Sequence, residues 1–234
     1  MQYIILAAGK GSRTGLNKPK VMIEYKKKTL LQHHLECARL YNLDPIVVTG
    51  YKSEEITGVE SIFNKNYNTT NMVESLMICY DKAYEDAIIS YGDIIFNPII
   101  LKNLIKENED FVITVDKNWT EYWKLRFIDI HEDTESLSIS NGYIKELGTP
   151  NPDIANIDAR YVGLMKFSKK ALKILNEIYL SDVKWKNAYM TDILQEAINQ
   201  GHKIKANNIN NMWLEFDNMD DIKNAEKYGR ILNV

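Results

Sequence analysis

The chain has 234 residues, of which 45% are hydrophobic and 26% are charged, and these proportions exclude collagenous and disordered proteins. The 29 Lys and Arg residues against 32 Asp and Glu residues give a formal net charge of −3, which argues against a nucleic-acid-binding protein. No apolar run approaches the roughly 20 residues of a membrane span, and no basic leader precedes the first apolar segment. The two cysteines, Cys37 and Cys79, match no metal-ligand spacing. We therefore expect a cytoplasmic protein that acts away from membranes.

The predicted elements alternate between strands and helices along the chain. The continuous apolar run over residues 3–8 predicts a strand buried on both faces, and Thr29 can cap the helix that follows it. Pro98 can open a further helix that ends near residue 106. The remaining strands are predicted at 46–49, 87–91, 111–115, 161–167 and near 204, and the remaining helices at 169–179, 191–199 and from 220.

The middle of the chain departs from this alternation. Residues 126–144 alternate apolar and polar side chains around an Asn141-Gly142 turn signal, which predicts antiparallel strands. The two prolines in residues 149–153 predict a turn. We expect an α/β fold in a single domain over residues 1–234, with a mostly parallel sheet flanked by helices and a small antiparallel insertion at roughly 117–165.

The most informative segment is a glycine-containing loop directly after the first strand, where residues 6–20 read LAAGKGSRTGLNKPK. Open α/β sheets bind their ligands at this end of a strand. Thr14 stands where a P-loop or a dinucleotide fingerprint needs a glycine, so neither motif is present. The small residues let a ligand approach the main chain, while Arg13 and Lys20 supply positive charge for a polyphosphate. A tight turn with solvated cations is the alternative.

The motif LAAGKGSR followed by PK resembles the signature of nucleotidyltransferases that activate small phosphorylated compounds with a nucleoside triphosphate. The resemblance implies a Rossmann-like sheet of the GT-A type and a loop that grips the triphosphate. It implies that Arg13 and Lys20 are catalytic, with Arg13 on the β- and γ-phosphates and Lys20 at the α-phosphate. The nucleotide contacts expected in and around the loop are Leu6, Ala7, Ala8, Gly9, Gly11 and Ser12.

Two features of the sequence favour CTP among the nucleoside triphosphates. Five residues separate Arg13 from Pro19, a shorter loop than in most sugar-1-phosphate members and one that occurs in relatives making cytidine-diphospho products. Residues 67–76 also resemble the Asn and Ser-Leu segment of phosphocholine and phosphonate cytidylyltransferases. This resemblance adds Asn71 and Ser75 to the expected nucleotide contacts, although Ser75 can equally start a helix. The Gly50-Tyr51 turn, which also resembles the family, adds Tyr51, and Gly92 of the later Gly-Asp pair completes the set.

Two aspartates are the expected ligands of a Mg²⁺ cofactor. Asp93 follows Gly92 after the predicted strand 87–91, and Asp217 ends the segment Trp-Leu-Glu-Phe-Asp. Mg²⁺ prefers one or two carboxylates together with phosphate oxygens and water. In the resembled family, a Gly-Asp pair and a late Trp-x-Glu-x-Asp segment supply these carboxylates. The alternatives are a loop residue for Asp93 and a helix cap for Asp217.

The acceptor site is predicted from aromatic and charged residues in the second half of the chain. Exposed aromatic rings attract a quaternary ammonium group, which favours phosphocholine, whereas arginines prefer phosphate or carboxylate. A phosphorylated amino acid or amide, or a phosphonate, therefore stays open as the acceptor. Rings that cover the core or a subunit contact are the alternative. The expected acceptor residues are Trp119, Trp123, Arg126, Arg160, Tyr189, Asp192, Trp213 and Glu215.

These observations predict a Mg²⁺-dependent cytidylyltransferase that joins CMP to a small phosphorylated acceptor and releases pyrophosphate. A phosphate monoester has a second pKa near 6 and is ionised at pH 7, so the reaction needs no dedicated general base. The alternatives are a sugar-1-phosphate nucleotidyltransferase that uses UTP, dTTP or another triphosphate, and a non-catalytic nucleotide-binding module. The expected partners are CTP and the acceptor, without nucleic acid or membrane, and a homodimer is left open.

Overall fold

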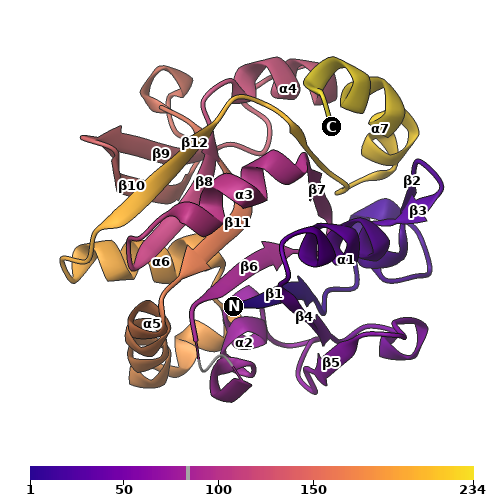
Figure 1. The fold of residues 1–234 in the computed structure, drawn as a ribbon. Coiled ribbons are helices and arrows are strands. Elements are labelled where there is room, and N and C mark those ends of the chain that lie inside the picture. Colours follow the sequence, from indigo (N-terminus) through magenta and orange to yellow (C-terminus); the bar gives the residue numbers. More distant parts are fainter. Residues whose placement is uncertain (83–84) are drawn as a thin grey trace.

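A computed structural model describes residues 1–82 and 85–234, and a nine-stranded sheet runs through its middle (Figure 1). In spatial order the strands are β5 (Glu60–Phe63), β4 (Asp44–Thr49), β1 (Gln2–Ala7), β6 (Ala87–Tyr91), β11 (Arg160–Phe167), β8 (Phe111–Asp116), β12 (Ile204–Ile209), β10 (Tyr143–Pro150) and β9 (Glu135–Ser140). The pairings give seven strands one direction and reverse only β10 and β11. The predicted α/β fold with a mostly parallel sheet is confirmed.

Helices cover both faces of this sheet because alternate residues of its strands point to opposite sides. In β1, Tyr3 and Ile5 belong to one core, whereas Ile4 and Leu6 belong to the other. The first core is covered by α1 (Leu30–Leu40), α3 (Pro98–Lys106), α4 (Trp119–Arg126) and α7 (Met219–Leu232). The second is covered by α2 (Met72–Met77), α5 (Lys169–Ser181) and α6 (Met190–Asn199). Among the described residues, no helix combines the length and apolarity needed to cross a bilayer.

Short elements complete the fold. Two small antiparallel sheets pair β7 (Ile94–Phe96) with β13 (Trp213–Glu215), and β2 (Glu24–Tyr25) with β3 (Lys28–Thr29). The 3-10 turns are η1 (Ser12–Thr14), η2 (Lys20–Met22), η3 (Ser53–Glu55), η4 (Tyr80–Lys82), η5 (Ile154–Asn156) and η6 (Val183–Asn187).

Local chemistry explains the starts of the predicted helices. Thr29 caps α1, because its hydroxyl accepts from the amide of Gln32 at 3.1 Å. Pro98 is the first residue of α3, and the side chain of Asn97 accepts from the amide of Ile99. Both helix starts predicted from these residues are confirmed.

The middle of the chain is partly as predicted. The hairpin β9–β10 turns at Asn141 and Gly142, which both have positive φ, at 52° and 79°. Residues 119–126 form a helix, however, and the first predicted antiparallel strand begins only at Glu135. The strands of residues 117–165, β9, β10 and β11, all belong to the nine-stranded sheet, where β10 and β11 are the two antiparallel strands.

Candidate nucleotide and metal site

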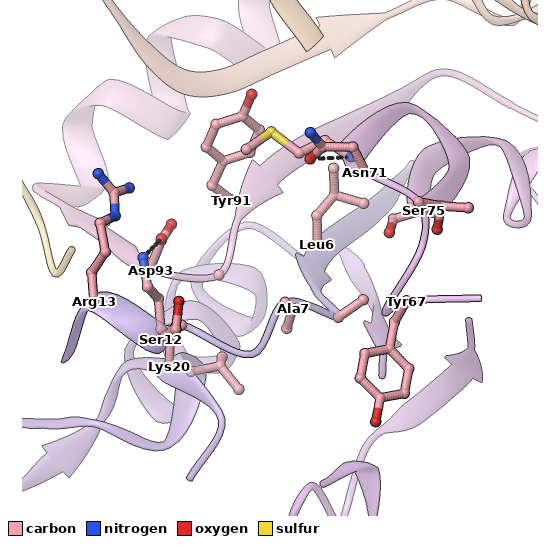
Figure 2. A pocket seen from close by; sticks show the side chains of 17 residues that line it. Leu6, Ala7, Ser12, Arg13, Lys20, Tyr67, Asn71, Ser75, Tyr91 and Asp93 are labelled. Atoms are coloured by element: carbon pink, nitrogen blue, oxygen red, sulfur yellow. Dashed lines mark hydrogen bonds and ion pairs between the residues drawn. The ribbon is translucent and has the colours of Figure 1, made fainter. Parts of the chain in front are cut away.

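A cleft of about 290 Å³ opens where β1 and β6 end and α2 begins (Figure 2). The glycine loop forms its floor. Eleven of the predicted nucleotide and catalytic residues of the first half of the chain meet here, together with the predicted metal ligand Asp93. The complete lining is Leu6, Ala7, Ala8, Gly9, Gly11, Ser12, Arg13, Lys20, Val21, Tyr67, Thr70, Asn71, Met72, Ser75, Tyr91, Gly92 and Asp93. The sequence therefore predicts most of one wall and its cations.

Gly11 fits Lys20 against the loop. Its φ of 62° lies in the left-handed region, where glycine is favoured. A Cβ atom added at Gly11 would lie 2.5 Å from Cγ of Lys20. The absence of a side chain at Gly11 therefore leaves room for the stem of Lys20, which starts η2 on the other side of the loop.

The Lys20 ammonium group lies between the two predicted metal ligands. Its Nζ atom is 2.7 Å from Oδ2 of Asp93 and 2.6 Å from Oδ1 of Asp217, and Figure 2 shows the first of these contacts. The Arg13 guanidinium is 3.1 Å from the same oxygen of Asp217. Burial alone would lower the pKa of Lys20, but Asp93 and Asp217 together raise it. The ammonium group is therefore held in its charged form.

The same cations shift the pKa of Asp217 in the opposite direction from that of Lys20. Burial alone would raise its pKa, but the charge and hydrogen bond of Lys20, with the charges of Arg13 and Arg126, lower it. The carboxylate is therefore charged at neutral pH.

The small β7–β13 sheet brings the two aspartates together. Ile94 pairs with Glu215, and the amide of Phe216 donates to the carbonyl of Asp93 at 2.9 Å. Asp93 directly precedes β7, and Asp217 is the second residue after β13, so both carboxylates project at the same end of this pair. The convergence of two segments distant in sequence thus rests on backbone hydrogen bonds.

Arg126 supports the Asp217 segment through buried ion pairs and is not free to bind an acceptor. Its side chain is 1% exposed, and two of its nitrogens contact the carboxylate of Asp221 at 2.8 Å each. A third nitrogen contacts Glu215. Asp221 in turn accepts from the amide of Asp217 at 3.0 Å. The predicted acceptor contact of Arg126 is wrong because its donors are committed to this buried network, and Glu215 is paired in it too.

The carboxylates fit a hard divalent cation. Asp93 and Asp217 already share one positive charge, that of Lys20. Oxygens of Asp133, Glu215 and Asp217 also lie within 4.8 Å of one another. Carboxylate oxygens are the protein ligands that Mg²⁺ prefers. Asp217 belongs to both groups, and Asp133, in the loop before β9, was not predicted from the sequence.

The remaining predicted nucleotide contacts differ in their placement. Asn71 lines the cleft and caps α2, since its side chain accepts from the amide of Met72. Ser75 lies inside α2 and accepts from Asn64 at 3.1 Å, so it does not start the helix. The amide of Gly92 donates a hydrogen bond to the carbonyl oxygen of Leu6, which connects the end of β6 to β1. Tyr51 is outside the cleft lining, and its hydroxyl donates to Asn17.

The predicted aromatic wall is wrong. Trp119, Trp123 and Trp213 are at most 2% exposed, because the first two face the core from α4 and the indole of Trp213 donates to buried Asp116. Tyr189 is 56% exposed, at the start of α6. Asp192 accepts from the amide of Tyr189 at 2.7 Å and so caps that helix.

Three polar residues at or near the cleft, Tyr91, Asp133 and Glu135, were not predicted from the sequence. Tyr91, which lines the cleft, packs edge-on against Tyr161. Burial raises the pKa of Glu135, at the start of β9, and lowers the pKa of Arg160, at the start of β11. The position of Tyr91 in the cleft could be inferred from the sequence, because it directly precedes the predicted Gly92-Asp93 pair. Asp133 and Glu135 belong to an acidic stretch that the sequence does not distinguish from a solvated loop.

A cleft at strand ends, lined by a glycine loop with Arg13 and Lys20 beside paired carboxylates, is typical of a nucleotidyltransferase. Residues 3–141 match the MobA-like NTP transferase domain. The chain belongs to this family.

Similar proteins extend the match over nearly the whole chain. The CTP:phosphoglutamine cytidylyltransferase of Campylobacter jejuni is 36% identical over 248 residues, which cover 95% of this chain and 98% of that protein. The inositol-1-phosphate CTP transferase of T. maritima has the same fold, with a TM-score of 0.73 at 21% identity, covering 97% of this chain and 96% of that one. The CTP:phosphocholine cytidylyltransferase of Streptococcus pneumoniae gives a TM-score of 0.72 at 16% identity, covering 97% of each chain.

Proposed function

We propose that this nucleotidyltransferase moves CMP from CTP to a phosphorylated amino acid or its amide, with phosphoglutamine as the leading acceptor. The observation that carries the proposal is the likeness to the phosphoglutamine enzyme, which spans 95% of this chain. This chain is a cytidylyltransferase for a small phosphorylated acceptor. The proposal concerns which acceptor it uses. The buried tryptophans support this choice over phosphocholine, because they leave no aromatic wall of the predicted kind for a quaternary ammonium group.

The proposed reaction needs little from the protein beyond position and charge. An anionic phosphate oxygen of the acceptor attacks the α-phosphorus of CTP and forms a new P–O bond. The bond from the α-phosphorus to the bridging oxygen breaks, and pyrophosphate leaves with that electron pair. No proton has to be removed when the attacking oxygen is already ionised, so catalysis rests on alignment and charge stabilisation.

The residues of the cleft divide this work. Main-chain amides of residues 9–12 face the triphosphate, and Arg13, whose side chain is 64% exposed, holds the departing phosphates. Lys20 neutralises charge at the α-phosphate, where its raised pKa keeps it protonated. Asp93 and Asp217 would hold Mg²⁺, which supplies charge neutralisation between the phosphates when bound.

Pyrophosphate release from the purified protein tests the proposal. Each of CTP, UTP and dTTP is paired with phosphoglutamine, phosphocholine, a phosphonate and a sugar 1-phosphate in the presence of Mg²⁺. The proposal predicts the highest kcat/KM for CTP with phosphoglutamine. Preference for a sugar 1-phosphate with UTP or dTTP would contradict it, and so would nucleotide binding without release from any pair.

A further inference from the structure

Arg160 is a cationic side chain beside the cleft whose hydrogen-bonding capacity is not used. Its Nη1 atom is buried and has no hydrogen-bond partner in the described part of the chain. The ion pairs among the described residues give the guanidinium a single partner, Asp133, at 3.6 Å. A buried guanidinium with unmet donors is costly. Because Arg160 lies beside the substrate cleft, an anionic ligand could accept the hydrogen bonds that its guanidinium group does not make within the protein.

Glu135 is the complementary anionic side chain. It stands at the start of β9, is half-buried, and lies two residues after Asp133, the ion-pair partner of Arg160. Leu137 of the same strand accepts from the amide of Asp158, two residues before Arg160, so the two segments run side by side. The two nevertheless form no ion pair, because the ion pairs among residues 1–82 and 85–234 leave Glu135 without a partner. Two opposite charges that are close but unpaired offer a ligand both a cation and an anion.

The pair lies on the side of the cleft where the acceptor must enter. Arg160 contacts Asp133, and carboxylate oxygens of Asp133 and Asp217 lie within 4.8 Å of each other. Tyr161, the residue after Arg160, packs against Tyr91, which lines the cleft. Arg126 is not a competitor for an anionic ligand, since Asp221 and Glu215 occupy its donors. Of the two arginines predicted to bind the acceptor, only Arg160 keeps free donor capacity.

Trp123 fixes the direction of the Arg160 side chain. The guanidinium carbon lies 4.4 Å from the centre of the buried Trp123 ring, a cation–π contact that orients the planar group. Asp133, which is 45% exposed, is a distant partner for this group. An incoming carboxylate can replace it.

We propose that Arg160 and Glu135 form a recognition site for the amino-acid end of the acceptor. Arg160 binds the α-carboxylate and Glu135 binds the α-ammonium group, while the phosphorylated end points to Asp217 and Lys20. This inference rests on the proposed function and goes beyond it by assigning the selectivity for a zwitterion to two side chains. Both are positioned outside the triphosphate cradle, so they act on acceptor choice and not on CTP binding.

The test uses three acceptors with the wild-type protein, CTP and Mg²⁺. They are phosphoglutamine, an analogue that lacks the α-carboxylate and an analogue that lacks the α-amino group. Wild type should favour phosphoglutamine over each analogue by on the order of 10- to 100-fold in kcat/KM, the range for charge-assisted hydrogen bonds. R160M should lose its preference over the analogue without carboxylate and keep that analogue's own kcat/KM. E135Q should do the same for the analogue without an amino group.

Matched variants keep the outcome interpretable. R160K retains the charge but not the fork, so it should give an intermediate preference. E132Q changes an exposed carboxylate in the same loop and should leave all three acceptors unchanged. The KM for CTP should stay constant in every variant, which shows that the fold and the triphosphate cradle are intact.

The contrary results separate the two proposals. If wild type uses phosphoglutamine but R160M and E135Q slow all three acceptors equally, the recognition site is refuted and the proposed function stands. The same holds if wild type uses the analogues as well as phosphoglutamine. If wild type releases no pyrophosphate with phosphoglutamine but does so with an acceptor that is not a zwitterion, both proposals fail.

Discussion

The carbonyl oxygen of Asp93 accepts a hydrogen bond from the amide of Phe216 at 2.9 Å. This backbone contact places Asp217, the next residue, where its carboxylate shares the Lys20 ammonium group with that of Asp93. The two predicted metal ligands, which lie far apart in the sequence, are therefore joined by main chain and not by side chains alone. Substitutions of the side chains should change charge at the site and leave this framework in place.

Removing the Lys20 ammonium group should abolish most turnover. In K20M, Asp93 and Asp217 lose the cation between them, and the α-phosphate loses its neutralising charge. The expected loss in kcat is ~10²–10³-fold, the size measured when one preorganised electrostatic contact is removed. K18M, in the same loop but outside the cleft lining, is the control in the pyrophosphate assay. Activity of K20M within a few-fold of wild type would remove Lys20 from the reaction.

Asp217 should set the requirement for Mg²⁺. D217N keeps the shape of the side chain but removes a negative charge, so half-maximal activity should need more Mg²⁺ and kcat should fall by on the order of 100-fold. A Mg²⁺ titration of the reaction measures both effects. D220N is the matched control, because Asp220 lies three residues on and its side chain is 80% exposed. An unchanged titration for D217N would reduce Asp217 to a structural residue.

The network under the site should matter for stability more than for chemistry. R126M leaves Asp221 buried without its cation, and breaking a buried pair in this way costs about 3–5 kcal/mol in the free energy of unfolding. R39M removes an exposed arginine and should have almost no effect. Urea unfolding compares the two variants with wild type. A loss below about 1 kcal/mol for R126M would show that the network is not a brace.

Gly11 and Gly15 separate backbone strain from the fit of Lys20. Both have positive φ, at 62° and 67°, but an added Cβ meets Lys20 only at Gly11. G11A and G15A should each lose about 1–2 kcal/mol of stability from the left-handed backbone. Only G11A should also lose activity, because it pushes the Lys20 stem off its path. Equal activity in the two variants would contradict the packing argument.

His34 should make the protein less stable in weak acid. Burial, followed by the charge of His33, lowers the pKa of His34 to about 4. The unfolded chain binds a proton at His34 below its ordinary pKa of 6.5, whereas the folded chain resists protonation until about pH 4. The free energy of unfolding should therefore fall as the pH drops from 6.5 to 4, by about 3 kcal/mol.

Unfolding curves for H34Q and wild type across this range measure the contribution of His34. H34Q should be less dependent on pH than wild type. If H34Q and wild type have the same slope, His34 does not contribute.

The sequence predicted the parts of the site that local pattern determines. The loop from Gly9 to Lys20 follows a strand, and its glycines and cations are contiguous, so their shared cleft could be inferred. Asp93 and Asp217 were found because each ends a recognisable segment. The pairing of β7 with β13, which brings the two aspartates together, could not be predicted. Strands of three residues are too short for the sequence to indicate which strands pair.

The acceptor side was predicted less well because it depends on tertiary packing. Aromatic residues in the second half of the chain predict an exposed wall, yet α4 turns Trp119 and Trp123 into the core and the indole of Trp213 donates to buried Asp116. The pairing of Arg126 with Asp221 joins residues 95 positions apart, so no local signal separates Arg126 from Arg160, whose Nη1 atom has no hydrogen-bond partner among the described residues. Glu135 was missed for the same reason.

The central claim is that one divalent cation and the triphosphate of CTP meet between Asp93 and Asp217. A crystal structure of the protein with CTP and Mg²⁺ tests it most directly. We predict that the triphosphate lies along residues 9–12 and that oxygens of both aspartates contact the ion. An ion held by Asp133 and Glu215 without Asp93, or CTP bound outside the loop, would contradict the account.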